Sequence, residues 1–262
     1  MKFTKTLLTT ALFSFSVFSI SQMGYAKTND AELVQQAILS GGEQLLRVVE
    51  AIKKNEFDTA ISLAQPLAEQ GNVMAQSALA LAYESREEYF QAFKWYQKAA
   101  EQGYARAQFY LALMYDNGQG VKQDYFQAFK WYQKAAEQGH IKAQYNLGQM
   151  YRTGQGVKQD YFQAFKWYQK VAEQGDAQAQ YNLGVMYHKG EGVKQDDFQA
   201  VKWNQKAAEQ GYADAQLNLG IMYALGEGVK QDLNLAKMWA GKACENGEQK
   251  GCNVYHMLNE GK

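Results

Sequence analysis

The stretch from Tyr125 to Gly139 reads YFQAFKWYQKAAEQG, and residues 89–103 repeat it without a change. Its small and aromatic side chains recur at i, i+3, i+4 and i+7, which is the spacing of one helical face. These residues are Ala128, Trp131, Tyr132 and Ala135. Asp124 stands in the N-cap position and Gly139 in the C-cap position. The stretch therefore predicts one amphipathic helix with a marked start and end.

A second apolar pattern follows directly, from Ile141 to Tyr151. Its members are spaced i, i+4, i+7 and i+8, and they are Ala143, Leu147, Met150 and Tyr151. The segment 154–157, Gly-Gln-Gly-Val, then predicts a turn before the next N-cap at Asp160. Each unit is therefore expected to be a helical hairpin, and neither helix can bury its apolar stripe alone.

The hairpin recurs every 36 residues along the chain. Five tryptophans keep this step, and so do five glycines that follow each of them by eight residues. The tryptophans are Trp95, Trp131, Trp167, Trp203 and Trp239, and the glycines are Gly103, Gly139, Gly175, Gly211 and Gly247. A fixed period of this length indicates stacked units. We predict an all-α fold, an α/α solenoid over residues 57–262 with a C-terminal capping hairpin, preceded by a helical cap over 27–56.

Composition agrees with many short helices joined by glycine turns, because 262 residues contain one Pro and 23 Gly. Basic and acidic side chains balance at 27 each. A nucleic-acid partner would favour a basic excess, so we expect none.

The N-terminus carries the pattern of an export signal. Lys2 and Lys5 precede an apolar run over residues 7–20, and Gly24-Tyr25-Ala26 offers small residues for cleavage after Ala26. A membrane anchor is the alternative, but the run is shorter than the roughly 20 residues that a spanning helix needs. We expect residues 1–26 to be removed, no membrane span in the mature chain, and a periplasmic or secreted protein.

The repeated strings resemble a known family. Residues 143–157 carry Ala-Gln-x-x-Leu-Gly-x-Met-Tyr-x-x-Gly-x-Gly-Val, and residues 164–175 carry Ala-x-x-Trp-x-x-Lys-x-Ala-x-x-Gly. This pattern resembles the Sel-one-like repeat, a relative of the tetratricopeptide repeat with a longer turn, over roughly residues 57 to 262. The resemblance implies right-handed superhelical stacking and adaptor roles without catalysis. Exported bacterial members of the family often bind host or envelope proteins.

Cys244 and Cys252 are the only cysteines. They occupy slots where the two helices of the last hairpin approach each other, and an even number in an exported protein favours a disulfide. Two free buried thiols are the alternative. The surrounding spacing also resembles the Hcp-type cysteine-rich solenoid proteins, in which such a pair recurs in each hairpin.

Motifs of catalysis and metal binding are missing from the sequence. The three histidines, His140, His188 and His256, fall in unrelated slots, and neither His-Glu-x-x-His, Ser-x-x-Lys nor Gly-x-Ser-x-Gly occurs. The Gly-x-Gly pairs recur with the hairpin and follow no strand, so they are interpreted as turn glycines. We predict no enzyme activity, no cofactor and no metal site. Because β-lactam hydrolysis has been attributed to some Hcp-type relatives, a β-lactam or cell-wall hydrolase is kept as an alternative.

The copies differ from one another mainly in the second helix of each hairpin. Between residues 104–117 and 140–153, nine of fourteen positions change, whereas the first helices of these hairpins are identical. Many of the changes lie at i, i+4, i+7 and i+11, which is a single helical stripe. The tetratricopeptide-like resemblance implies that this helix lines the concave face. The alternative is a tolerant solvated surface that is free to drift.

We hypothesise that this stripe and its neighbours bind a protein or peptide. The asparagines would pair with a peptide backbone, the tyrosines would add apolar area, and the basic residues would attract a carboxylate. The predicted partner-binding residues are Arg106, Tyr110, Lys142, Tyr145, Asn146, Gln149, Arg152, Asn182 and Asn218. A structural scaffold of an envelope assembly is a further alternative. The sequence names neither the partner nor the oligomeric state.

Overall fold

The computed structural model describes residues 42–260, which form α-helices and, over this range, no strand. The helices are α3 Glu43–Lys53, α4 Phe57–Glu69, α5 Val73–Ser85, α6 Tyr89–Glu101, α7 Ala105–Asn117, α8 Tyr125–Glu137, α9 Ile141–Thr153, α10 Tyr161–Ala172, α11 Ala177–Lys189, α12 Asp197–Glu209, α13 Ala213–Leu225, α14 Leu233–Glu245 and α15 Gln249–Asn259. The all-α fold of repeated helical hairpins is confirmed. The predicted signal, residues 1–26, and the first part of the predicted cap lie outside the described residues.

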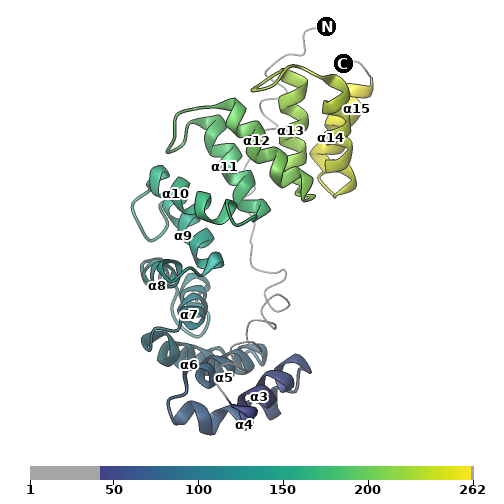
Figure 1. Cartoon of the computed structure of the whole chain (residues 1–262). Coiled ribbons are helices and arrows are strands. Elements are labelled where there is room, and N and C mark those ends of the chain that lie inside the picture. The colour runs from purple at the N-terminus through teal and green to yellow at the C-terminus, as the bar shows by residue number, and fades with distance from the viewer. Residues whose placement is uncertain (1–41, 261–262) are drawn as a thin grey trace. The chain divides into compact units, whose positions relative to one another are not determined.

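The described residues divide into two compact units. The N-terminal unit holds α3 to α8 and α9 as far as Met150, and the C-terminal unit holds Tyr151–Thr153 and everything from Gln159 onward. Within each unit, helices that follow one another in sequence pack side by side, as α7 does on α8 and α13 on α14 (Figure 1). A single continuous solenoid over residues 57–262 stays a prediction.

The hairpins begin and end where the sequence marks them. Asp124 and Asp160 cap the starts of α8 and α10, and each carboxylate accepts a hydrogen bond of 3.0 Å from the backbone N–H three residues later. Gly118 and Gly154 end α7 and α9 with left-handed backbone, at φ values of 70° and 77°. The second helix of the repeat extends two residues beyond the predicted end at Tyr151.

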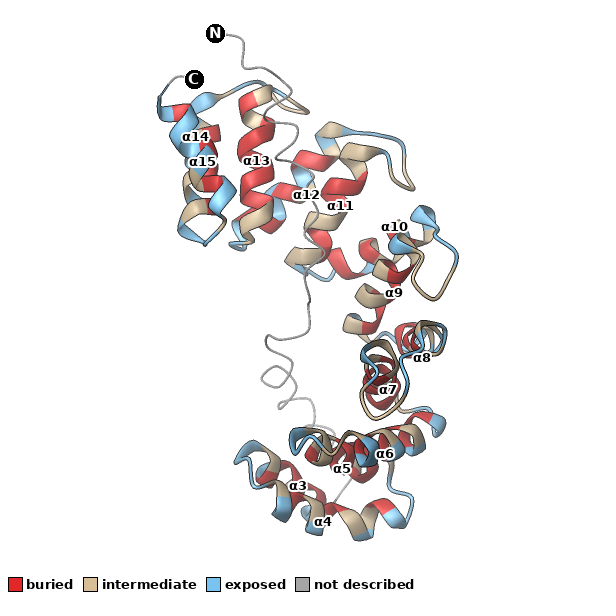
Figure 2. Ribbon diagram, turned by 180° about the vertical axis from the view of Figure 1, so that it is seen from behind, coloured by how far each residue is buried: buried red, intermediate tan, exposed pale blue. Residues whose placement is uncertain are grey.

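The core consists of alanines, of one tyrosine from each of three first helices (Tyr96, Tyr132 and Tyr168), and of leucines and methionines of the second helices. Figure 2 shows the buried positions along these helices in red. The tryptophans do not all lie in it. Trp95 and Trp239 are buried, but Trp131, Trp167 and Trp203 are only partly covered. The sequence pattern placed Trp131 on the apolar face of its helix, and the structure covers it only partly, because its position lies at the border of the buried stripe.

A ladder of buried glutamines joins neighbouring hairpins within each unit. One glutamine near the start of each second helix is at most 7% exposed: Gln76, Gln108, Gln144, Gln180 and Gln216. The amide N–H of Gln108 donates to the carbonyl of Ala100, 3.2 Å away. Its carbonyl accepts from Gln138 of the next hairpin at 2.7 Å. Such paired amides satisfy backbone carbonyls that the end of the first helix leaves open.

The second glycine of each turn is required by a close backbone approach. Gly120 has φ +68°, and a Cβ built on it would lie 2.3 Å from the carbonyl oxygen of Tyr89, at the start of α6. Gly228 lies in the same way against Asp197 of α12. The interpretation of the Gly-x-Gly pairs as turn glycines is confirmed, because each turn lies over the beginning of the preceding first helix.

The two cysteines lie on the facing helices of the last hairpin. Cys244 is near the end of α14 and Cys252 near the start of α15, with their Cα atoms 4.6 Å apart. This separation is within the range that a disulfide requires, so the pair is disulfide-capable.

Candidate binding surface

The variable stripe lies on the second helices, and the N-terminal unit carries its basic part on α7 and α9. Arg106 is only 8% exposed, and its guanidinium lies 5.6 Å from the centre of the Tyr110 ring. Tyr110 is 5% exposed and stacks on Tyr96 with ring centres 5.1 Å apart. The sequence interpretation placed Arg106 and Tyr110 off the buried stripe, and the structure differs, because both side chains are packed beneath this surface.

The residues that stay accessible in the N-terminal unit are on α9. Lys142, Tyr145, Asn146 and Gln149 are all half-buried along one side of this helix. They combine an ammonium, a phenol and two amides within eight residues. Such a mixture offers hydrogen-bond donors and acceptors beside apolar area, as protein-binding surfaces commonly do.

Cations dominate the electrostatics of this part of the stripe. Burial, together with Arg106 and Lys142, lowers the pKa of His140 to about 4. Burial and Arg106 also lower the pKa of Lys142. The neutral His140 ring stacks on Phe109 at 4.5 Å, and its Nδ1 accepts from the backbone N–H of Ala143. Arg106 thus disfavours the charged forms of His140 and Lys142, and it also interacts with the carboxyl of Glu84 on α5.

The C-terminal unit has the opposite character. Burial and the nearby Glu248 raise the pKa of Asp214 at the start of α13. The rings of Tyr181 and Tyr212 lie 5.3 Å apart, and Tyr212 is hydrogen-bonded to Asp214. Burial, with Asp214 as the next cause, raises the pKa of Tyr181 to about 12. Asp214 therefore takes the position that Arg106 and Lys142 hold in the N-terminal unit, and Tyr212 takes that of His140.

The three asparagines of the predicted ladder are not equivalent. Asn146 and Asn182 are half-buried, but Asn218 is only 4% exposed and is hydrogen-bonded to Tyr181. The sequence interpretation placed all three off the buried stripe, and for Asn218 the structure differs because Tyr181 of the preceding hairpin covers it.

Arg152 is also separated from the basic group that the sequence suggested. It belongs to the C-terminal unit, where its guanidinium lies near the buried phenol of Tyr168 on α10. Arg106 and Lys142 are therefore the arginine and lysine that the structure brings together, with His140 as a third basic group that sequence reasoning left unassigned. Its place in the N-cap slot, where Asp176 stands one repeat later, was the available signal.

No metal-binding group of three or more His, Cys, Asp or Glu side chains occurs within residues 42–260. In the same range, no helix is both long and apolar enough to cross a bilayer. Two shallow depressions, one on α6 and one on α10, lie on first helices rather than on the variable stripe.

Comparison with known proteins gives one family over most of the chain. The Sel1 repeat matches five successive segments, residues 73–104, 105–140, 141–176, 177–212 and 213–248. No curated protein gave a match.

Solved structures agree with this match. The chain is 34% identical to c5321, a protective antigen of uropathogenic Escherichia coli with an SLR fold, at a TM-score of 0.78 over 90% of this chain and 52% of that one. It therefore spans about half the length of c5321. A Sel1 repeat protein from Oxalobacter formigenes is 36% identical, at a TM-score of 0.74 over 80% of this chain and 88% of that chain. The cysteine-rich protein HcpB of Helicobacter pylori is 22% identical, at a TM-score of 0.36 over 53% of this chain and 96% of that one.

Proposed function

Because the chain belongs to the Sel1 repeat family, we propose that it is a non-enzymatic scaffold that binds a protein or peptide on its second helices, α7, α9, α11 and α13. The family is in general a protein–protein interaction scaffold. The finer proposal, that the ligand lies on the second-helix stripe, rests on the residues of this chain alone.

One observation carries the proposal. The first helices α6, α8 and α10 are almost identical, whereas the second helices differ at many positions, among them the stripe spaced i, i+4, i+7 and i+11. The accessible side chains on or beside that stripe in α9, Lys142, Tyr145, Asn146 and Gln149, offer donors, acceptors and one cation. Variation concentrated in the second helix of the repeat is what a surface fitted to one particular ligand would show.

The charges of the stripe define the ligand further. Arg106, His140 and Lys142 favour an anionic group in the N-terminal unit, so the ligand presents a carboxylate or an acidic side chain there. An amide such as that of Asn146 can donate to and accept from an extended backbone. The proposed ligand is therefore an extended segment with an acidic part.

The proposal also places the protein outside the cytoplasm. Residues 1–26 carry the pattern of an export signal. The disulfide-capable pair, Cys244 and Cys252, suits an oxidising compartment. Expression of the full chain in a bacterial host should yield a periplasmic or extracellular form whose mass corresponds to residues 27–262. A full-length protein that stays with the cytoplasmic fraction would contradict this part.

The binding role is tested by capture from envelope extract and extracellular host fluid, with residues 27–262 as bait. The triple variant Lys142→Ala, Asn146→Ala and Gln149→Ala removes the accessible polar groups of α9. The matched control, Phe126→Ala, Lys130→Ala and Lys134→Ala, removes as many side chains from α8. We expect a partner that the control retains and the α9 variant loses. A partner lost only by the control would move the site to the first helices and contradict the proposal.

The hydrolase alternative gains no support from the described residues. The surface offers no activated nucleophile, and the expected outcome of a nitrocefin assay with pure protein is no turnover above the rate without protein. Turnover that follows the protein through purification would overturn the non-enzymatic reading.

A further inference from the structure

Three apolar side chains on the second helices of the N-terminal unit are partly open to solvent. Met74 and Leu81 on α5 and Leu113 on α7 are half-buried. They occupy the second and ninth positions of their copies, which belong to the variable stripe. One such residue is ordinary on a protein surface, but three of them on neighbouring second helices leave apolar area that the hairpins do not cover.

The hairpin does not require this opening. The residues that stand in the place of Leu113 in the C-terminal unit are Val185, which is 7% exposed, and Ile221, which is fully buried. The same position can therefore be covered, and packing does not account for the open leucines. In α9 the position is taken by the half-buried Gln149. The stripe thus changes from apolar on α5 and α7 to polar on α9.

The helix α7 connects the apolar part of the stripe to Lys142. Arg106 of α7 interacts with Glu84 on α5 and, after burial, is the second cause that lowers the pKa of Lys142 on α9. The ring of Phe109 on α7 stacks on that of His140 at the start of α9, with centres 4.5 Å apart. The open leucines and Lys142 therefore belong to adjoining helices of one unit.

The carboxyls of these helices are directed away from the stripe. Across α5, α7 and α9 the acidic residues are Glu84 and Asp116. Their carboxylates accept hydrogen bonds from the buried phenols of Tyr96, at 2.7 Å, and Tyr132, at 3.2 Å. Burial raises the pKa of both carboxyls. Neither carboxyl is therefore positioned to neutralise a cation on the stripe.

Lys142 supplies the accessible charge. The exposed carboxyls at the ends of α6 and α8, those of Glu101 and Glu137, each accept from an amide of their own helix at 2.9 Å. A carboxylate that dominated the surroundings of Lys142 would raise the pKa of its ammonium. Burial and Arg106 lower that pKa instead. The surroundings of Lys142 thus favour an anion.

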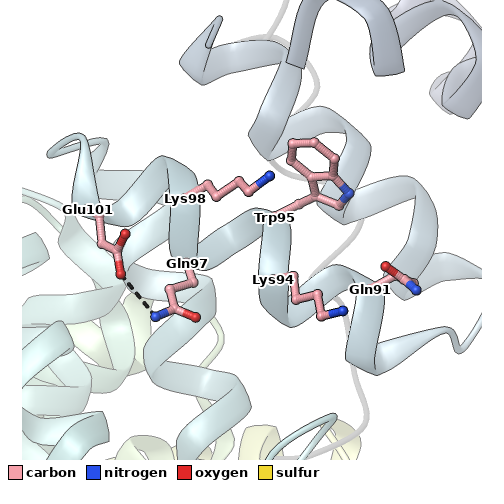
Figure 3. Close-up of a pocket in the computed structure, with 6 residues that line it drawn as sticks. All are labelled: Gln91, Lys94, Trp95, Gln97, Lys98 and Glu101. Atoms are coloured by element: carbon pink, nitrogen blue, oxygen red, sulfur yellow. Dashed lines mark hydrogen bonds between the residues drawn. The ribbon is translucent and has the colours of Figure 1, made fainter. Parts of the chain in front are cut away.

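The depression on α6 does not offer a comparable site. In Figure 3 Lys98 reaches toward the indole of Trp95, and its ammonium lies 4.0 Å from the ring centre. Gln97 donates to Glu101 at 2.9 Å. All the residues that line the depression belong to this one helix: Gln91, Lys94, Trp95, Gln97, Lys98 and Glu101. Its ring, one of its ammonium groups and its carboxylate already have partners within α6, so we place no ligand there.

We propose that the second-helix surface of the N-terminal unit binds an extended peptide segment that carries an apolar side chain and, about four residues away, an acidic one. This inference rests on the proposed function and adds to it the apolar contact and the spacing. Leu81 and Leu113 would hold the apolar side chain, and Lys142 would hold the carboxylate.

The spacing follows from helix geometry. The ninth and second positions of a copy are about 10 Å apart along the helix axis, and neighbouring helices are about 10 Å apart. Leu113 and Lys142 are therefore separated by roughly 14 Å, which about four extended residues span. Over this distance Asn146 and Gln149 can donate to and accept from the peptide backbone.

Two other anionic partners fit less well. Lys142 is the only lysine of α5, α7 and α9, and one ammonium cannot neutralise the run of phosphates that a nucleic acid brings. A lipid surface would require a broad apolar side on one helix. Here each helix offers one or two apolar side chains beside amides. A peptide needs a single charge contact and a single apolar contact.

The test begins with a library of random 12-residue peptides displayed on phage, selected against residues 27–262. We expect the enriched peptides to combine an aliphatic or aromatic side chain with Asp or Glu about four residues away. Enrichment of basic peptides, of peptides without an apolar side chain, or of no peptide at all overturns the proposal.

The affinity of the most enriched peptide is then measured by fluorescence anisotropy. The double variant Leu81→Ser and Leu113→Ser should bind it at least ~10-fold more weakly. The matched control, Phe90→Ser and Phe126→Ser, removes two apolar side chains that are 59% and 54% exposed on α6 and α8 of the same unit. It should stay within ~3-fold of the unchanged protein. An equal loss in both variants overturns the proposal.

The charge contact is tested separately. Lys142→Gln should weaken binding of the same peptide by ~5-fold or more at low salt and should remove most of its dependence on salt. A salt dependence that survives this substitution overturns the role of Lys142.

The variant of α9, with Lys142, Asn146 and Gln149 replaced by Ala, separates failure of this inference from failure of the proposed function. If it abolishes binding and the leucine variant does not, the ligand lies on the second helices and only this inference is overturned. If neither variant changes the affinity, both are overturned.

A measurement on the unchanged protein decides the matter where the leucine variant fails to fold, as circular dichroism would show. The methyl signals of Met74, Leu81 and Leu113 in nuclear magnetic resonance spectra should shift when the peptide is added. The methyl signal of Met222, which is 2% exposed in the C-terminal unit, should stay in place. Unshifted signals at all three residues overturn the proposal.

Discussion

The second helices of the two units are built on the same hairpin and differ in charge at one equivalent position, which Arg106 and Lys142 occupy in the N-terminal unit and Asp214 in the C-terminal unit. In the N-terminal unit burial, together with Arg106 and Lys142, lowers the pKa of His140 to about 4. In the C-terminal unit burial and Glu248 raise the pKa of Asp214. The scaffold beneath them is the same, with a buried glutamine such as Gln108 or Gln216 bonded in the same way. The copies therefore share the buried residues that stabilise the hairpin, whereas the side chains on the surface of the second helix differ from copy to copy.

The largest expected effect tests whether the scaffold is shared. Gly120→Ala and Gly228→Ala should each destabilise their own unit by about 3 kcal/mol or more, because the new Cβ would meet backbone atoms at 2.2 to 2.3 Å. Gly103→Ala is the control, since it meets nothing within 4 Å and adds only the strain of φ +91°, about 1 kcal/mol. Hydrogen exchange measured segment by segment along the chain gives the loss in unfolding free energy for each unit. Very unequal costs at Gly120 and Gly228 would mean that the two scaffolds differ.

The disulfide-capable pair occurs in the C-terminal unit. Replacing Cys244 and Cys252 by Ser should destabilise that unit by about 2–3 kcal/mol, the chain-entropy value for so short a loop. Exchange in α14 and α15 should rise, while α5 to α8 keep their protection. The same loss of stability in the unchanged protein under reducing conditions would identify the disulfide as the cause. No loss of stability in either case would contradict a stabilising disulfide.

The glutamine ladder gives a smaller effect that should again be equal in the two units. Gln108→Ala and Gln216→Ala each remove two hydrogen bonds and leave a buried carbonyl without its donor, so each should cost about 2 kcal/mol. Gln138→Ala removes the bond between hairpins and a long one of 3.4 Å to the exposed carbonyl of Lys134, and it should cost about 1 kcal/mol. Urea denaturation of the three variants measures these values. A negligible cost at Gln108 would show that the ladder does not hold the hairpins together.

The smallest expected effect is the pH dependence of stability, which should differ between the unit that contains His140 and the unit that contains Asp214. The pKa of His140 in the folded chain is below its usual 6.5, so the unfolded chain takes up the proton first. Stability from this group is complete above about pH 6.5 and falls by roughly 1–3 kcal/mol as pH drops toward 4. The raised pKa of Asp214 acts in the opposite direction and favours its unit at low pH.

From pH 7 to pH 5, the protection from exchange, corrected for the intrinsic exchange rate at each pH, should therefore fall more in α7 and α9 than in α13. His140→Asn keeps an N-capping side chain without the titration, and it should remove most of the difference. A pH response that is the same in both units, or unaffected by this variant, would refute the assignment.

Much of the fold follows from sequence because helix periodicity, caps and turn glycines repeat and agree in every copy. Asp124, Gly118 and Gly120 lie where a local pattern is enough to predict them. The binding surface is harder to predict, because burial at the border of a helical stripe depends on the neighbouring hairpin. Asn218 looked accessible, yet Tyr181 from the preceding hairpin covers it.

The exposed positions of the first helices were also hard to predict from the sequence. Phe126 stands next to Tyr125 in an aromatic run, and periodicity alone does not tell which ring faces water. The structure leaves Phe126 54% exposed and covers Tyr132 completely. Identical copies offer no contrast by which such an exposed position could be recognised from sequence.

The central claim, that ligand lies on the second helices, is tested most directly by hydrogen exchange of the full mature chain with and without its captured partner. The account predicts slower exchange in α7, α9, α11 and α13 on binding, strongest in α9, with α6, α8, α10 and α12 unchanged. Protection confined to the first helices would contradict it and would make their exposed phenylalanines and lysines the partner's site instead.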